Sequence, residues 1–522
     1  MSTVIPNGQI RFLSGVPLEN SYEDSLDFTT RDAQTSYFLS IQPVKTMVGA
    51  TRVRDGVINV DCLSDTILTA DYLMFQNTGF SNKWFYAFIT NIEYVNNNMC
   101  HVTYEIDDIQ TWMFDVQLKE CFIEREHTAT DKLYEHLVDE GIATSDYIIS
   151  NTNSYNLTST LTALVFTGAW VVSGAIARQA PRAWQGNLSS LGVLQYDVKT
   201  SGSWNTNEIQ QLGRDLEELV EAQQADSVVE MVCFPTDFIS QADTKYPTGH
   251  TLDFPSRTSL NGYTPKNNKM YNSPYCIYTL QASNGQKLVL QPELFTDDDE
   301  NHSAVLEPDV SPTPAILATV GHYKGITPNY QYSIEFSGFP QVPFNVDGYK
   351  AWVAAGGLTK LQFNAGVDLA QSVVGIGANA ITGNPAGMAG SMLEGGRSAF
   401  NAYIDLNVAK TLPASVRGAL SSSPLLANGE AKFRTTYETI PKDIAISIDN
   451  YFTMFGYKVN KIGTPSRRNR PHYTFIKTRG AKVVGGAPAD AIDRIQRIYD
   501  SGIRFWVNAS EVGNYNVNNA PR

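Results

Sequence analysis

Alternating apolar and polar positions predict a β-hairpin early in the chain. Residues 83–95 are rich in aromatic and β-branched side chains, and Val102, Tyr104 and Ile106 alternate with polar neighbours. Three asparagines, residues 96–98, separate the two runs. Asparagine is typical of tight turns because it tolerates a positive φ. The first 130 residues are therefore expected to consist of strands.

The middle of the chain predicts short helices among further strands. Residues 129–142 and 214–225 have helical spacing, and Gly141 ends the first of these helices. The apolar run 161–177 is short and contains Thr, Ser and many β-branched residues. It predicts a buried strand followed by a loop and not a membrane span. Residues 230–345 are short aromatic segments broken by Pro, Gly and Asn, which favours β structure.

The C-terminal region, β-like after about residue 425, also contains one helix. One face of this helix carries Ile492, Ile495 and Tyr499. Asp490 is its expected N-terminal cap, and Gly502 is expected to end it. Residues 503–507 then alternate as a final strand.

One stretch differs from the rest of the chain, because residues 369–393 carry no charge and are crowded with Gly and Ala. Helical spacing flanks it on both sides, through Trp352, Val353, Leu358 and Leu361 upstream and Phe400, Ile404, Val408 and Leu412 downstream. Pro413 ends the downstream pattern. Two helices joined by a long uncharged linker suggest a protruding arm.

A membrane role for this stretch depends on how many copies act together. As a helix, residues 369–393 would be about 37 Å long, which spans a bilayer. Five glycines and Pro385 make that helix unfavourable in water by roughly 8 kcal/mol. The six Leu, Val and Ile residues contribute only about −2 to −4 kcal/mol in lipid. Copies held side by side would share their polar groups and pack through small residues.

Two alternatives for the same stretch are a flexible linker and a buried small-residue loop. The apolar side chains argue against a linker, because Gly/Ser linkers lack them. A loop that is tucked away at rest and inserts into a membrane after a trigger accounts better for the composition.

Composition limits the class of protein. The chain has 522 residues, 42% hydrophobic and 18% charged, which describes a folded multidomain protein. A net charge of −14 argues against a general nucleic-acid binder, because such proteins need basic surfaces. The five scattered cysteines indicate reduced thiols, and the first residues lack the apolar core of a signal peptide.

The sequence contains no pattern that specifies an enzyme, a metal site or a cofactor. The motifs HExxH, GxSxG and GxxxxGK[ST] are absent, and the seven histidines are dispersed. Gly375, Gly377 and Ala380 fit a dinucleotide fingerprint, but the helix that should follow would run through Pro385 and several glycines. The acidic run 296–302 lacks EF-hand spacing and is interpreted as a solvated turn. No enzyme activity and no cofactor are therefore predicted.

Several aromatic blocks resemble a known viral family. "DYLMFQNTGFSNKWFYAFITNIEY", "YEIDDIQTWMFDVQLKECFIEREH", "YFTMFGYKVNKI" and "RIYDSGIRFWVNASEVGNYNVNN" are similar, in order and spacing, to the distal tail-knob proteins of short-tailed phi29-like picovirus phages. These blocks cover residues 70–127 and 450–519. Their signature residues, expected in the core or at a subunit interface and not as ligand platforms, are Phe75, Trp84, Phe85, Tyr86, Trp112, Met113, Phe114, Tyr457, Phe505 and Trp506.

The resemblance implies a mainly β fold with minor α structure: β-barrel or β-sandwich modules that form a tube on hexamerisation, plus a helix-flanked hydrophobic loop. In that family six such loops fill the distal channel and interact with the host membrane during delivery. The residues that match this role are Leu369, Val373, Val374, Ile376, Ile381, Met388, Met392 and Leu393.

The resemblance also implies partners, a location and a division into parts. The implied partners are five further copies, an upper tail tube or collar protein, a tail-tip wall-degrading protein, the host membrane and genomic DNA in transit. The implied location is the virion tail, after assembly in the host cytoplasm. The predicted parts are residues 1–130, 131–250, 251–345, 346–424 and 425–522, with the last returning to the first. The alternative function is a receptor-binding or wall-adhering tail protein without membrane activity.

Overall fold

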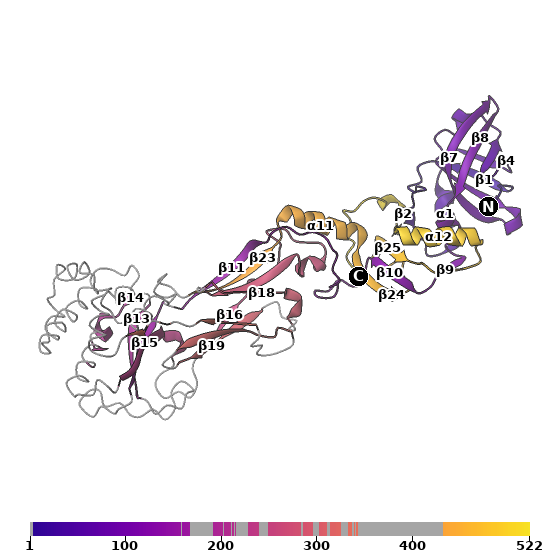
Figure 1. The fold of residues 1–522 in the computed structure, drawn as a ribbon. Helices are drawn as coiled ribbons and strands as arrows, with labels where there is room; N and C mark the ends of the chain where they lie inside the picture. Colours follow the sequence, from indigo (N-terminus) through magenta and orange to yellow (C-terminus); the bar gives the residue numbers. More distant parts are fainter. Residues whose placement is uncertain are drawn as a thin grey trace. The chain divides into compact units, whose positions relative to one another are not determined.

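The protein is mainly β with a minor α component, as predicted (Figure 1). The structure is a computed structural model. It describes residues 4–157, 159–167, 192–201, 203–209, 211–212, 215, 228–239, 249–282, 285–295, 302–310, 314–324, 332–336, 339, 341–342 and 432–521.

The chain forms two compact units, and each is assembled from separate segments. Unit 1 comprises Met1–Ser145, Tyr263–Asn272 and Pro441–Arg522. Unit 2 comprises Asp146–Gly262 and Ser273–Ile440. The C-terminal segment therefore folds with the N-terminal one. The finer division into five parts stays a prediction.

A seven-stranded antiparallel sheet forms the N-terminal part of unit 1. Its strands in order are β3 (Lys45–Val48), β1 (Gln9–Leu13), β6 (Tyr72–Asn77), β7 (Lys83–Asn96), β8 (Met99–Ile106), β5 (Val57–Val60) and β4 (Thr51–Arg54). The two edge strands β3 and β4 are consecutive, and only Gly49 and Ala50 separate them. Because so short a connection reaches about 11 Å, the two edges must lie close together and the sheet must curl.

The predicted hairpin is confirmed as β7 and β8, which pair in antiparallel register. Its turn does not use the positive φ that the sequence suggested, since Asn96, Asn97 and Asn98 all keep a negative φ. Instead the Asn96 side chain accepts a hydrogen bond from the backbone N–H of Asn98 at 2.9 Å.

Both faces are buried over Tyr72–Phe75 of β6 and Phe85–Phe88 of β7, which explains the apolar sequences of these two stretches. One face, with Phe75 and Phe85, packs in a core that includes residues of α12 (Ala489–Ser501) and α2 (Asp108–Trp112). The other face, with Tyr72 and Tyr86, packs against Phe38 of α1 (Arg31–Ser40). Phe75 and Phe85 are cross-strand partners whose rings stack with centroids 5.4 Å apart.

A five-stranded sheet joins the ends of the chain within unit 1. Its order is β2 (Asp24–Leu26), β27 (Ile503–Trp506), β25 (Tyr473–Arg479), β10 (Cys121–Glu126) and β24 (Tyr457–Gly463). Only the pairing of β2 with β27 is parallel. Helix α11 (Lys442–Phe455) precedes β24, and β9 (Val116–Leu118) pairs with β26 (Val483–Gly485).

The described residues of unit 2 form three antiparallel sheets. The first has the order β11 (Ile148–Asn156), β23 (Lys432–Thr439), β17 (Cys276–Ala282) and β18 (Lys287–Leu290). The second has the order β14 (Ser203–Trp204), β13 (Gly192–Thr200), β12 (Leu161–Thr167), β15 (Val228–Pro235) and β22 (Gln341–Val342). The third has the order β16 (His250–Asp253), β19 (Ser303–Asp309), β20 (Ala315–Val320) and β21 (Ser333–Phe336).

Several local predictions are confirmed by these elements. The strand expected at the start of residues 161–177 is β12, the C-terminal helix is α12, and the final strand is β27. Gly502 ends α12 with a φ of 97°. Asp490, however, is not the cap, because it lies in the first turn and pairs with Arg494 at 3.4 Å. The predicted helix at 214–225 lies outside the described residues, apart from Asp215.

The predicted helix at 129–142 is wrong, because no part of that segment is helical. Its polar side chains are instead committed to distant partners: Asp131 accepts a hydrogen bond from Tyr457 at 2.7 Å, and Glu140 pairs with Arg125 and Lys269. The prediction of strands is also wrong for two other regions, because they form the helices α1 and α11. Tertiary contacts override a weak local preference in all these places.

The close approach at the end of α11 gives a test of packing. Gly456 has a φ of 64°, and a Cβ atom there would lie 2.2 Å from the carbonyl oxygen of Glu126. We expect Gly456→Ala to lower the free energy of unfolding by about 3 kcal/mol or more, measured by urea denaturation. Gly480→Ala is the control, because Gly480 has a φ of 68° but no atom within 4 Å of the added Cβ. It should cost about 1 kcal/mol, and equal losses in both variants would contradict the steric argument.

Candidate functional site

Signature aromatic residues of unit 1 lie beside a partly buried ion pair. Lys83 Nζ lies 3.5 Å from the centroid of the Trp112 ring and 2.6 Å from Asp115 Oδ2. Asp115 also pairs with Arg31 at 2.7 Å. Burial lowers the pKa of Lys83, and Asp115 opposes that shift. Burial acts to raise the pKa of Asp115, but hydrogen bonds from Lys83 and Arg31 bring it below its usual value. The cluster fixes the start of β7 against the residues that follow α2.

The other signature residues are core residues of unit 1 or lie at its margin. Trp84 and Phe114 are half-buried, and the rest of the predicted set is buried. Trp506 donates a hydrogen bond from Nε1 to Asp24 Oδ1 at 2.7 Å, and its ring packs 4.4 Å from that of Tyr473. Met113 Sδ accepts a hydrogen bond from Gln34 Nε2 at 3.7 Å. A role of these residues between copies of the chain stays a prediction.

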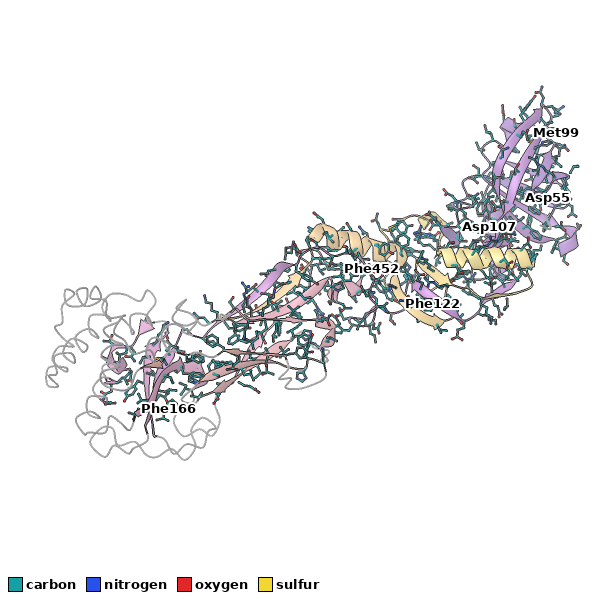
Figure 2. All side chains as sticks on the ribbon, viewed as in Figure 1. Asp55, Met99, Asp107, Phe122, Phe166 and Phe452 are labelled. Atoms are coloured by element: carbon teal, nitrogen blue, oxygen red, sulfur yellow. The ribbon has the colours of Figure 1, made fainter. Side chains whose placement is uncertain are left out.

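Asp107 is a buried carboxyl at the N-terminus of α2 (Figure 2). It accepts hydrogen bonds from Tyr72 Oη at 2.8 Å and from the backbone N–H of Gln110 at 3.0 Å. Burial raises the pKa of Asp107 to about 7. The unfolded carboxyl ionises near pH 4, so the folded state loses stability from this group as pH rises from about 4 to about 7.

His127 is a buried neutral imidazole that links the end of β10 to β25 and α11 in unit 1. Its Nδ1 accepts the backbone N–H of Phe475 at 2.8 Å, so the ring proton is on Nε2 and faces the carbonyl of Thr453 at 3.1 Å. Burial, and then the charge of Arg470, lower the pKa of His127 to about 3. An unfolded histidine binds a proton near pH 6.5, so this group destabilises the folded state as pH falls from about 6.5 towards 3.

Glu140 is a buried carboxylate with three partners in unit 1. Its side chain is 1% exposed and pairs with both Arg125 and Lys269. Its Oε1 also accepts the backbone N–H of Lys458 at 3.0 Å. Arg125 in turn donates to the carbonyl of Gly456 at 2.7 Å. One carboxylate therefore binds residues from all three segments of unit 1.

Asp449 on α11 is a second buried carboxylate, with no exposed surface. Its Oδ2 accepts Tyr263 Oη at 2.7 Å and the backbone N–H of Lys266 at 2.8 Å. Its Oδ1 accepts the backbone N–H and the side-chain amide of Asn267 at 3.2 and 2.9 Å. These bonds anchor the short segment Tyr263–Asn272 in unit 1.

The described residues show no catalytic constellation. They contain no group of three or more His, Cys, Asp or Glu side chains placed to hold a metal ion. Glu124 and Glu126, which lie two positions apart on β10, bind different lysines, Lys477 at 3.0 Å and Lys461 at 2.5 Å. Within the same described ranges, no helix is long and apolar enough to cross a membrane.

The predicted plug residues cannot be placed in this site, because residues 343–431 lie outside the described residues. That range includes the whole uncharged stretch and its two flanking helical patterns. The sequence did not indicate Glu140, Asp449 or His127 either. Their partners are up to 348 positions away in the chain, so no local spacing could have indicated them.

Comparison with known proteins agrees with this architecture. The family model described as the C-terminal domain of tail knob protein gp9 of Bacillus phage phi29 matches residues 239–520, more than half of the chain. A model of the N-terminus of caudoviral major tail proteins matches residues 6–117, which include the seven-stranded sheet. The chain is 24% identical to tail knob protein gp9 of Bacillus phage PZA and 23% identical to that of phi29. Each match covers 98% of both chains.

A solved structure shares the fold. The tail knob protein gp12 of bacteriophage C1 superimposes with a TM-score of 0.64 at 14% identity, over 98% of this chain and 99% of that one. The mainly β fold and these matches define a structural protein of phage tails. The chain belongs to the family of the phi29 tail knob protein gp9. It is therefore a component of the virion tail and associates with other tail components.

The buried cluster of Glu140, Arg125 and Lys269 can be tested for its contribution to the stability of unit 1. Glu140→Gln would leave Arg125 and Lys269 buried without a counter-charge, so we expect the free energy of unfolding to fall by about 3–5 kcal/mol. Urea denaturation followed by tryptophan fluorescence measures the loss. Glu135→Gln, at an exposed position of the same segment, should change stability little. If Glu140→Gln lowered the free energy of unfolding as little as Glu135→Gln does, the cluster would not hold the segment.

The buried imidazole gives a pH-dependent test. His127→Gln removes the group that must stay neutral, so the stability advantage of the wild type over the variant should shrink as pH falls from about 7 to about 4. The wild-type slope alone is not informative, because Asp107 has the opposite pH dependence. Urea midpoints of both proteins at each pH give the difference. His101→Gln on β8, whose ring is half-buried, is the control, and an advantage that is constant with pH would contradict the assignment.

Proposed function

We propose that six copies of this tail-knob protein form a tube at the tail tip, and that apolar loops of residues 369–393 close its channel. On infection the loops leave the channel and perturb the host membrane, so that the genome passes. The observation that carries the proposal is an uncharged run of 25 residues within a chain that matches tail knob proteins over 98% of its length.

The charge of the chain is compatible with a conduit for DNA. A hexamer would carry −84, which is six times −14. DNA carries about one negative charge per 1.7 Å of helix axis, so an acidic channel lets it slide where a basic one would bind it. In this proposal the genome contacts the protein without sequence-specific binding. The tube joins an upper tail tube or collar protein above and a wall-degrading tail-tip protein below.

The number of copies is what makes the membrane step feasible. A single Gly/Ala-rich helix from residues 369–393 would gain too little from its apolar side chains to insert alone. Six helices held together by the tube would start at a high effective concentration. They could then pack through their small residues and satisfy their polar groups with one another.

The alternative function is a receptor-binding or wall-adhering tail protein in which the uncharged stretch is merely structural. A cleft of unit 1 that brings together Arg125, Lys458, Lys477 and Tyr451 favours this second candidate. The two functions differ in whether the protein itself permeabilises a membrane.

Dye release from anionic liposomes tests the membrane step. We expect the intact protein to release dye, and a Gly-Ser replacement of residues 369–393 to release none. The double variant Val374→Asp and Ile376→Asp should also lose release, because a charge at the centre of an inserted helix costs about 2.5–3.5 kcal/mol. Val374→Leu with Ile376→Leu is the matched control and should release dye like the wild type. The mass of each variant in solution checks the hexamer.

The result is informative in either direction. Release by the intact protein and the Leu control alone would support the membrane role. An absence of release by every variant, at every pH between about 4 and 8, would contradict it and leave the stretch as a plug at most. A monomeric mass for the intact protein would contradict the tube.

A further inference from the structure

Unit 1 has a cleft that neither the tube nor the loops account for. It has a volume of about 430 Å³ and is lined by residues of β10, β24, β25 and α11, together with Glu140 and the last residue of α12, Ser501. Figure 2 labels Phe122 on β10 and Phe452 on α11, the elements that form two of its walls. A volume of this size accommodates a small organic ligand.

Three cationic residues lie in one row across the sheet at this cleft. Arg125 on β10 is the cross-strand partner of Lys458 on β24 and of Lys477 on β25. Neighbouring strands are about 4.8 Å apart, so the three side chains start close together. Like charges placed directly opposite each other destabilise a sheet. Such a row therefore needs compensation by anions.

The protein compensates only part of this charge. Glu140 pairs with Arg125, and Glu124 pairs with Lys477 at 3.0 Å. No described carboxylate forms an ion pair with Lys458 Nζ. The lining thus has three cations against two carboxylates, in a chain whose net charge is −14. The lining therefore has one positive charge in excess.

An aromatic wall stands beside the cations. Tyr451 on α11 is 37% exposed, and its ring lies 5.0 Å from that of Phe455. The guanidinium of Arg125 lies 4.8 Å from the centroid of the Tyr451 ring. An exposed ring next to cationic groups offers an apolar platform for the C–H face of a sugar and a charge for its substituent.

We propose that this cleft binds a phosphorylated sugar. The phosphate lies between Lys458 and Lys477, and the sugar ring packs against Tyr451. Lysine ammonium groups bind phosphate as point charges, and Arg125 remains with Glu140. The sugar phosphate is either a free small molecule or a repeating unit of an anionic polymer. The proposed ligand site requires neither the hexamer nor the loops. An absence of ligand binding would therefore not contradict the tube, and a monomeric protein would not contradict the ligand site.

Calorimetric titration of the full-length protein tests the site. The ligands are inorganic phosphate, glucose 1-phosphate, glucose and a poly(glycosyl phosphate). Glucose 1-phosphate should bind more tightly than phosphate or glucose, and added salt should weaken its binding. Lys458→Gln and Lys477→Gln should each weaken it about tenfold or more. Tyr451→Leu should remove the advantage of glucose 1-phosphate over inorganic phosphate.

A matched control separates the site from general charge. Arg497→Gln removes the same charge from an exposed position on α12 outside the cleft, and should leave binding unchanged. Thermal denaturation of each variant establishes that it is folded. Tighter binding of the polymer than of the monomer, lost in Lys458→Gln, would identify the polymer as the source of the ligand. Equal binding per phosphate would identify the free sugar phosphate.

Three results would overturn the proposal. The first is no binding of inorganic phosphate or glucose 1-phosphate at millimolar concentration. The second is an equal loss of affinity in Arg497→Gln and Lys458→Gln. The third is glucose binding as tightly as glucose 1-phosphate. Dye release by Lys458→Gln at the wild-type level would show that the cleft and the membrane step are separate functions.

Discussion

The organisation of unit 1 depends on two carboxylates that are buried with their partners. Glu140 binds Lys269, which is 129 positions away, and the backbone of Lys458, which is 318 positions away. Asp449 binds Asn267 across 182 positions. A charge taken out of water is costly unless it is paired and hydrogen-bonded, so each carboxylate tolerates only the arrangement that supplies all its donors. This requirement holds three separated segments in one compact unit.

The centre of the seven-stranded sheet, Tyr72–Phe75 and Phe85–Phe88, follows a different constraint, the burial of two faces. Phe75 and Phe85 point into one core, while Tyr72 and Tyr86 point into another. These stretches have no solvent face, so their sequences lose the alternation that marks an ordinary antiparallel strand. The first of the aromatic blocks that resemble the tail-knob family supplies this doubly buried part of the sheet.

The success of prediction differed between elements for physical reasons. The hairpin β7–β8 and helix α12 were predictable because their periodicity and stop signals are local. The segment 129–142 was not, because Asp131 and Glu140 use their side chains for distant partners in place of a helix. Helix α11 ends at Gly456, which lies against Glu126 and cannot carry a Cβ. That contact appears only after β10 and α11 are brought together.

The sequence by itself determined the mainly β class, the aromatic signature of the tail-knob family and the uncharged stretch, because composition and short-range spacing carry them. Tertiary structure decided how the chain returns to unit 1, which carboxylates are buried and which cations meet in the cleft. Arg125, Lys458 and Lys477 are unremarkable in three separate strands. Antiparallel pairing places them in one row, and register is a property of the folded sheet that no single strand contains.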